Sequence, residues 1–243
     1  MIAELGGRAA VVTGAASGIG FAAAERFAAQ GMRVMLADIA VGRLEDAVRE
    51  LRSRGATAWG FPVDVSRAED VEALAAAAES RLGPVGVLVN NAGIVNIGSA
   101  WELSLAEWHR VIDINLWGVI HGVLAFLPRM LRAATPAHIV NIGSMASVIP
   151  HPGLGPYVTA KHAVLGFSDS LRGDLAATGA PIGVTVVMPG RVRTGMNAEG
   201  MPPRVVADAI VEAVRHDIPH VFTEPQRVRD AAERFDALLN GPR

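Results

Sequence analysis

The chain has 243 residues, of which 51% are hydrophobic and 19% are charged, and its formal net charge is −2 at pH 7. A chain of this length can bury a large core, and its interspersed charges exclude a basic tail or patch for nucleic acid or an anionic membrane. The lack of cysteine excludes disulfides, thiolate chemistry and cysteine metal sites, and the seven histidines show no ligand-like spacing. We therefore expect a small-molecule ligand and no metal.

The N-terminal stretch, MIAELGGRAAVVTG, lacks both the basic start and the long apolar run of a signal peptide or membrane span. We therefore expect a soluble, cytoplasmic protein. The sequence contains no internal repeat, low-complexity segment or linker that would mark a boundary, so we expect one domain over residues 1–243.

Short apolar runs alternate with longer amphipathic stretches, and these indicate buried strands and helices, respectively. The predicted strands cover residues 8–13, 33–38, 56–65, 85–90, 138–143 and 183–189, with a last strand before Pro225. The predicted helices cover residues 21–30, 42–54, 68–82, about 104–134, a stretch from about 156, and about 204–216. Because parallel strands need crossover connections, this order predicts an α/β fold with a doubly wound parallel sheet and helices on both faces.

A glycine-rich turn, TGAASGIG at residues 13–20, joins the first predicted strand to the first helix. Gly14, Gly18 and Gly20 let the backbone turn tightly and approach a diphosphate, which the N-terminus of the helix then holds. Such a turn also occurs as a plain strand–helix corner. The strand–turn–helix context favours dinucleotide binding.

Asp38 ends the second predicted strand, where its carboxylate can accept hydrogen bonds from both hydroxyls of an adenosine ribose. The same carboxylate would repel a 2′-phosphate, and no basic residue stands at Ser17 or Ile39. This pattern favours NAD(H) over NADP(H), although Arg43 could swing toward the site. The alternative role for Asp38 is a cap on the helix that begins near residue 42.

Tyr157 is the single tyrosine of the chain, and Lys161 is its single lysine beside 21 arginines. Residues four apart share a helix face, so the two side chains are expected to be neighbours. A nearby ammonium lowers the pKa of a phenol, usually about 10, and so favours Tyr157 as a base. Arginine cannot replace the compact ammonium, which explains why one lysine survives. The alternative is a coincidental pair on a helix.

Two further polar residues stand near these motifs. Ser144, in NIGSMAS, follows an apolar strand and so lies at the carboxyl edge of the sheet, where α/β proteins place their chemistry. Asn115, in DINLWG, falls inside the predicted helix over about 104–134, where an asparagine is usually solvated or bridges to water. Neither residue indicates a function by itself.

Further motifs follow in order: DV at 64–65, NNAG at 90–93, YVTAK at 157–161 and PGRVRT at 189–194. With TGAASGIG, Asn115 and Ser144, they resemble the short-chain dehydrogenase/reductase family over residues 8 to about 195. The resemblance implies a Rossmann-type fold with a seven-stranded parallel sheet. It also implies a catalytic tetrad, whose members are Asn115, Ser144, Tyr157 and Lys161.

The resemblance implies the cofactor contacts as well. Asp64 and Val65 are expected near the adenine, and Val192 and Thr194 beside the nicotinamide amide, whereas Asn90 resembles a strand-stabilising residue. The full set expected to bind the nicotinamide cofactor is Gly14, Ser17, Gly18, Ile19, Gly20, Asp38, Asp64, Val65, Asn91, Gly93, Tyr157, Lys161, Val192 and Thr194.

In the implied mechanism, hydride passes between the carbinol carbon of the substrate and the nicotinamide, with Tyr157 as the acid or base. Ser144 hydrogen-bonds the substrate oxygen and stabilises the charge that develops there. Lys161 fixes the ribose and lowers the pKa of the tyrosine, while Asn115 holds a water that connects the lysine to solvent.

The chain departs from the family pattern after about residue 195. Only GMNAEGMPP separates PGRVRT from the next helix, so residues from about 195 form a short substrate lid, followed by the amphipathic helix, the last strand and an atypical charged C-terminal helix. Met196 and Met201 in the lid favour a bulky apolar substrate, because methionine surfaces adapt in shape. The alternative is that both simply pack against the domain.

Family members often assemble as oligomers, so we expect a homodimer or homotetramer, with the helices that carry Trp117 and Tyr157 as the dimer faces. The main functional hypothesis is an NAD(H)-dependent oxidoreductase for a secondary alcohol or ketone. One alternative is an NADPH-dependent 3-oxoacyl reductase, which the lack of basic residues near Gly18 and Asp38 disfavours. Another is a non-catalytic nicotinamide-binding sensor, which has no use for Tyr157 with Ser144.

Overall fold

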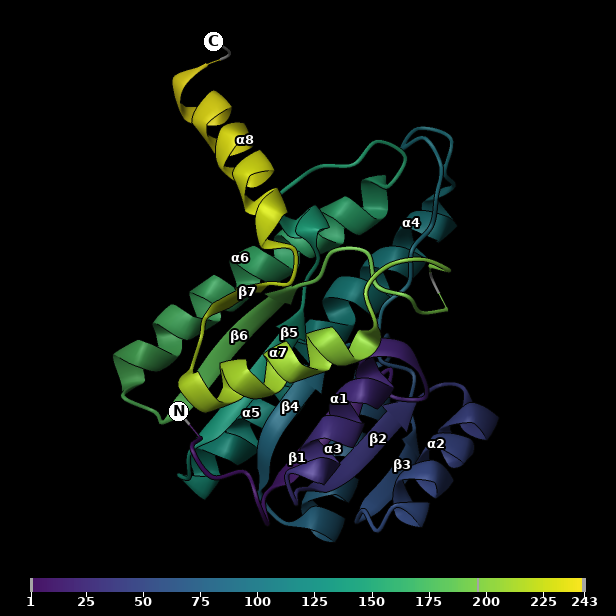
Figure 1. Cartoon of the computed structure of the whole chain (residues 1–243), viewed down its shortest axis with the longest axis vertical. Helices are drawn as coiled ribbons and strands as arrows, with labels where there is room; N and C mark the ends of the chain where they lie inside the picture. Colours follow the sequence, from purple (N-terminus) through teal and green to yellow (C-terminus); the bar gives the residue numbers. More distant parts are fainter. Residues whose placement is uncertain (1, 196, 242–243) are drawn as a thin grey trace.

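The computed structural model describes residues 2–195 and 197–241. Seven parallel strands form one sheet in the order β3-β2-β1-β4-β5-β6-β7 (Figure 1), which confirms the predicted fold. The strands are β1 (Ala9–Thr13), β2 (Arg33–Asp38), β3 (Ala58–Pro62), β4 (Val85–Asn90), β5 (Ala137–Ile142), β6 (Ile182–Met188) and β7 (His220–Phe222). The helices are α1 (Gly18–Ala29), α2 (Val41–Ser53), α3 (Ala68–Leu82), α4 (Leu105–Ile112), α5 (Gly118–Ala133), α6 (Gly155–Thr178), α7 (Pro203–His216) and α8 (Val228–Asn240).

The core lies in two layers, one on each face of the sheet. Alternate residues of β1 point to opposite faces: Ala10 and Val12 pack with α1, α2 and α7, whereas Ala9 and Val11 pack with α3, α5 and α6. Every residue of β1, β5 and β6 is buried. Most residues of these strands are therefore apolar, because both faces of each strand are covered, and the few polar ones, such as His138 and Asn141, are buried with them.

The position of β1 in the sheet determines where a ligand can bind. β1 pairs with β2 on one side and with β4 on the other, so the chain reverses its direction of winding between β1 and β4. The connections that leave the carboxyl ends of these two strands diverge to opposite faces. A crevice forms at such a point, and α/β proteins bind their ligands there.

The long helix predicted over about 104–134 is interrupted. Between α4 and α5, residues Asp113–Trp117 form a π-helix, and Asn115 lies inside it. A single π-helical turn adds a residue to the helix and often marks a functional position. The stretch Leu105–Ala133 is long and apolar enough to cross a membrane by length and composition alone, and Val123 and Phe126 on its inner side pack against the sheet, as in a core helix.

The C-terminal region follows the predicted order of helix, strand, turn and charged helix. β7 adds the last strand beside β6, and a short 3-10 turn, Pro225–Arg227, leads into α8. α8 projects away from the body of the molecule (Figure 1). Ala231 near its start is buried, whereas Leu239 near its end is 82% exposed.

Candidate active site

The glycine-rich turn between β1 and α1 is shaped by contacts that only glycine allows. Gly14 and Gly18 adopt positive φ angles of 63° and 57°. A Cβ on Gly20 would overlap with the carbonyl oxygen of Gly14 and the amide of Asn91. The backbone is therefore open to the close approach of a diphosphate, and α1 begins at Gly18 with unpaired N–H groups in its first turn.

A cleft of about 450 Å³ opens at the carboxyl edge of the sheet and joins nearly all the predicted site residues. Gly20 is the exception, because it packs against Gly14 instead of lining the cleft. The predicted residues that line the cleft are Gly14, Ser17, Gly18, Ile19, Asp38, Asp64, Val65, Asn91, Gly93, Asn115, Ser144, Tyr157, Lys161, Val192 and Thr194.

Asp38 lies at the end of β2, and its carboxylate shapes the neighbouring turn. Its Oδ2 accepts a hydrogen bond from the Ala16 N–H at 3.0 Å, and its Oδ1 accepts one from the Ala40 N–H at 2.9 Å. The alternative that Asp38 caps the next helix is wrong, because Ala40 occupies that position and α2 has no side-chain cap. Arg43 also lines the cleft.

Asn91 ties the carboxyl ends of β1 and β4 together. Its Nδ2 donates to the carbonyl oxygens of Thr13 at 2.8 Å and Gly14 at 3.2 Å. The Thr13 hydroxyl accepts the N–H groups of Asn91 and Ala92 at 3.0 and 3.1 Å. Thr13 could not be identified as a site residue from the sequence, because a threonine at the end of a buried strand carries no signal of its own.

Tyr157 and Lys161 lie one turn apart at the start of α6, as the sequence spacing predicts. The Nζ of Lys161 lies 5.6 Å from the centroid of the Tyr157 ring. It is buried and donates to the carbonyl oxygen of Ile142 at 2.8 Å. Burial lowers the pKa of Lys161 to about 8, because desolvation disfavours the ammonium.

The pKa of Tyr157 is shifted in the direction opposite to the expected one. Burial raises it above the usual value, and a hydrogen bond with the Ser144 side chain opposes the rise. The expected lowering by Lys161 is wrong for this structure, because burial outweighs the other effects on the phenol. The phenol is therefore protonated at neutral pH.

Ser144 is held by a reciprocal pair of hydrogen bonds at the end of β5. Its hydroxyl accepts the Ala146 N–H at 3.1 Å, and the Ser147 hydroxyl accepts the Ser144 N–H at 3.2 Å. Ser147 is buried and was not predicted. Its spacing of three residues from Ser144 is the available signal, since that spacing is typical of a capping box.

Asn115 braces the loop that follows β4. Its Nδ2 donates to the carbonyl oxygens of Ile94 and Val111, both at 2.9 Å. Its buried Oδ1 has no hydrogen-bond partner among the described residues, and a Cβ on Gly93 would lie 2.7 Å from that atom. The π-helix thus turns Asn115 inward to the cleft, whereas the sequence analysis placed it in a regular helix.

The structure also places the other residues that the sequence singles out. Asn90 donates to the Asn141 side chain at 2.9 Å and so joins β4 to β5. The side chain of Met201 packs against the core, while Met196 lies outside the described residues. Within residues 2–195 and 197–241, no group of three or more His, Asp or Glu side chains is arranged to hold a metal ion.

A family model described as short chain dehydrogenase matches residues 8–203. The chain belongs to the short-chain dehydrogenase family. It is 39% identical over 240 residues to 1-deoxy-11-beta-hydroxypentalenate dehydrogenase of Streptomyces avermitilis, with 93% of this chain and 88% of that protein covered. Because the chain belongs to this family and is similar to a dehydrogenase, it is an NAD(P)-dependent oxidoreductase of the alcohol dehydrogenase and ketoreductase type. Its substrate is a small molecule.

Two solved structures of the family illustrate the cofactors it uses. A short-chain dehydrogenase/reductase of Burkholderia phymatum in complex with NAD has a TM-score of 0.93 and 34% identity, covering 97% of this chain and 95% of that one. A variant of actinorhodin polyketide ketoreductase with NADPH has a TM-score of 0.84 and 32% identity, covering 88% of this chain and 95% of that one. Both nicotinamide cofactors thus occur among similar structures.

Proposed function

We propose that this short-chain dehydrogenase transfers a hydride between NAD(H) and a bulky, apolar secondary alcohol or ketone. The proposal rests on one observation. Ser144, Tyr157 and Lys161 line the same cleft as the glycine-rich turn and Asp38. Bound NAD(H) accepts or supplies the hydride at its nicotinamide ring. The protein supplies the proton and holds the substrate oxygen.

Tyr157 is the acid and base of the proposed reaction. In reduction, its protonated phenol donates a proton to the carbonyl oxygen; in oxidation, its phenolate removes the alcohol proton. Ser144 hydrogen-bonds the substrate oxygen and stabilises the charge that develops on it. The lysine ammonium, with a pKa of about 8, remains mostly protonated at pH 7 and would bind the ribose hydroxyls. Asn115 holds the loop after β4 in place and offers its free Oδ1 to a water.

The preference for NAD(H) over NADP(H) rests on Asp38. Its carboxylate lines the cleft at the end of β2, where it can accept hydrogen bonds from both ribose hydroxyls and would repel a 2′-phosphate. Arg43 lines the same cleft, and among the described residues that line it Arg43 is the arginine that could attract a phosphate. An NADPH-dependent 3-oxoacyl reductase is therefore the alternative, and Asp38 disfavours it.

The proposed substrate class rests on the surface of the cleft and its rim. Ile94, Ile142 and Pro189 line the same cleft as Ser144 and Tyr157. The loop after β4 and the start of α4 expose three further large apolar side chains, with Ile97 77%, Trp101 86% and Leu105 73% exposed. The Streptomyces relative is named for a hydroxypentalenate, and an alcohol of that kind would supply the hydroxyl that the proposed reaction needs.

We also propose that the protein is a cytoplasmic homodimer or homotetramer with one domain over residues 1–243 and a short lid from about residue 195. Large apolar side chains repeat every seven residues along the end of the π-helix and the outer face of α5, with Trp117 47%, Leu124 65% and Leu131 44% exposed. A second copy of the chain would cover this stripe. Sedimentation equilibrium of the full chain tests assembly, and a monomer at micromolar concentration would contradict it.

The first experiment compares the wild type with Tyr157→Phe by nicotinamide absorbance. Secondary alcohols are tested with NAD and NADP, and bulky apolar ketones with NADH and NADPH. We expect NAD(H)-linked turnover by the wild type and a loss of about 10³-fold in kcat for the variant, because the proton donor is gone. Cofactor binding, measured by titration, should stay within a few-fold.

Each other result contradicts part of the proposal. Equal turnover by the two proteins would remove Tyr157 from the chemistry. Turnover with NADP(H) alone would favour the 3-oxoacyl reductase hypothesis. Cofactor binding without turnover of any compound would favour the non-catalytic sensor.

A further inference from the structure

The segment that follows β7 holds the loop at the nicotinamide side of the cleft. The Gly190 N–H donates to the Thr223 hydroxyl at 3.3 Å, and the Arg191 N–H donates to Oε1 of Glu224 at 3.1 Å. Two consecutive N–H groups of the loop thus bind two consecutive side chains that follow β7. A Cβ on Gly190 would overlap with the carboxylate of Glu224, so the Glu224 side chain lies against the Gly190 backbone in space that only glycine leaves open.

Glu224 is well placed to act as a rigid acceptor. Its side chain is only 17% exposed, and its second carboxylate oxygen lies 3.9 Å from a guanidinium nitrogen of Arg227. A carboxylate that accepts a backbone N–H forms a stronger hydrogen bond than a neutral acceptor does. Partial burial strengthens the bond further, because fewer water molecules compete for the N–H.

The loop itself forms part of the proposed cofactor site. Gly190, Val192 and Thr194 line the cleft, while Arg191 is exposed. The far side of the loop pairs with Met201, whose N–H donates to Arg191 O and whose carbonyl oxygen accepts the Arg193 N–H, both at 3.0 Å. The loop is therefore held from two sides, by Met201 on one and by Glu224 on the other.

We propose that Glu224 is a positioning residue for this loop. Through the Arg191 N–H, its carboxylate fixes the path of residues 189–194 and so carries Val192 and Thr194 to the cleft. The inference deepens the proposed function, since it names what orients the nicotinamide-side loop, and it rests on that function for its effect on cofactor affinity. Glu224 itself does not line the cleft and takes no part in proton or hydride transfer.

The test uses three variants of the full chain. Glu224→Ala removes the acceptor, and Glu224→Gln keeps a carbonyl oxygen at the same distance along the side chain but loses the charge. Glu233→Ala, at an exposed position on α8, is the matched control. Melting temperature is measured for each, so that a variant that fails to fold is recognised and the conclusion then rests on Glu224→Gln.

The first readout needs no cofactor. Hydrogen exchange is followed by mass spectrometry in peptides that cover residues 182–188 and 189–195. We expect Glu224→Ala to speed exchange at the Arg191 amide by about tenfold, the effect of losing one charge-assisted hydrogen bond, while the β6 peptide stays unchanged. Glu224→Gln should restore part of the protection, because its neutral carbonyl oxygen still accepts the N–H but forms a weaker hydrogen bond. Glu233→Ala should match the wild type.

The second readout is the dissociation constant for NADH. We expect Glu224→Ala to weaken binding by about tenfold, with Glu224→Gln close to the wild type. Unchanged exchange and unchanged affinity in Glu224→Ala would overturn the inference, and so would a Glu224→Gln variant as impaired as the alanine variant. A wild type that binds no nicotinamide cofactor would refute the proposed function instead, and the exchange data would still decide the role of Glu224 in the loop.

Discussion

The two ends of the sheet each bury one basic side chain, and burial lowers the pKa of both. At the carboxyl end, Lys161 is 4% exposed and its pKa is lowered to about 8. Toward the amino end, His138 on β5 is fully buried and its pKa is lowered to about 4. The physical cause is the same, since desolvation disfavours a positive charge.

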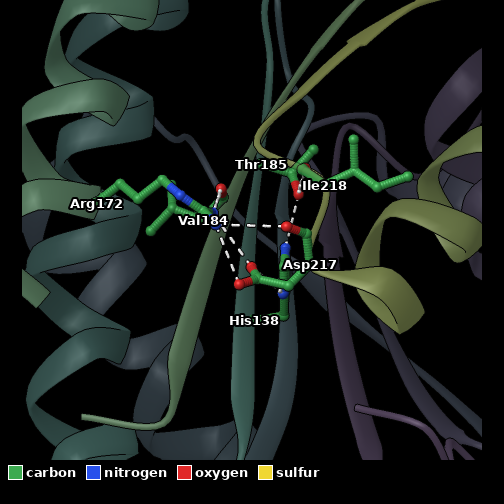
Figure 2. A network of polar contacts seen from close by, with 6 residues as sticks. All are labelled: His138, Arg172, Val184, Thr185, Asp217 and Ile218. Carbon is green, nitrogen blue, oxygen red and sulfur yellow. Dashed lines mark hydrogen bonds and ion pairs between the residues drawn. The ribbon is translucent and has the colours of Figure 1, made fainter. Parts of the chain in front are cut away.

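The surroundings of the two side chains differ. Lys161 lines the cleft beside Tyr157. His138 is enclosed by protein: its Nε2 lies 2.7 Å from the Thr185 hydroxyl, and its Nδ1 lies 3.9 Å from Oδ1 of Asp217 (Figure 2). Because Thr185 donates its proton to the Ile218 carbonyl oxygen, it accepts one from His138 Nε2, and Nδ1 carries no proton.

A second basic residue completes the network around His138. Arg172 donates to Oδ1 and Oδ2 of Asp217 at 3.1 and 3.0 Å and to the Val184 carbonyl oxygen at 2.7 Å (Figure 2). Asp217 adopts a left-handed backbone with φ of 52° at the end of α7. The network joins α6, α7, β5 and β6. We therefore expect a buried basic group to serve chemistry where it lines a cleft, and structure where its partners close around it.

The largest effect that follows from this comparison is on Lys161. We expect Lys161→Met to lower kcat by about 10³-fold, because the ammonium near the phenol and the ribose is lost. The stability of the fold should change by about 1 kcal/mol or less, since a buried charge and one hydrogen bond disappear together. Steady-state kinetics and thermal melting measure the two effects.

Lys161→Arg is the sharper form of the same experiment. The guanidinium keeps a positive charge but is too broad for a fully buried position that is built around a compact ammonium. We expect it to restore little of the lost turnover. Wild-type turnover in Lys161→Arg would mean that charge alone suffices at this position.

The sequence predicted most of the elements, because the alternation of apolar runs and amphipathic stretches reflects a sheet covered on both faces. The resemblance to the short-chain dehydrogenase/reductase family predicted the tetrad, and its four members line one cleft in the structure: Asn115, Ser144, Tyr157 and Lys161. It could not predict the pKa direction of Tyr157, which depends on how deeply the phenol is buried. Nor could it predict that Arg191 binds Glu224, 33 positions away, because no spacing rule links distant loops.

The acid sensitivity of the fold should come from His138 and not from Lys161. The folded pKa of His138 is about 4 and its ordinary value is 6.5, so below pH 6.5 the unfolded chain binds the proton first. The free energy of unfolding is therefore unaffected by His138 above pH 6.5 and decreases as the pH drops toward 4. The decrease reaches about 2 kcal/mol by pH 5. For Lys161, the folded and unfolded chains bind protons differently between the folded pKa of about 8 and the ordinary value of 10.5. This pH range is alkaline, so Lys161 does not contribute to acid sensitivity.

Urea unfolding at pH 7 and pH 5 measures this difference. His138→Gln keeps a donor near Thr185 but does not titrate, so its stability should fall less between the two pH values than that of the wild type. His109→Gln, at an exposed position on α4, is the control and should behave as the wild type. An equal fall in the His138 variant and the wild type would assign the acid sensitivity to other groups.

The smallest effect concerns Arg172, which acts on both partners of the network. Its charge lowers the pKa of His138, whereas the charge of Asp217 raises it. Arg172→Met should cost about 1 kcal/mol at pH 7, because the ion pair with Asp217 is about one-third exposed and solvent screens it. With Asp217 freed and the like charge removed, the pKa of His138 should rise toward 6.5, so the variant should lose less stability than the wild type on acidification to pH 5.

Urea unfolding at both pH values, with Arg229→Met on α8 as the exposed control, measures the two opposed effects. A variant that became more acid-sensitive than the wild type would contradict this account of the charges around His138.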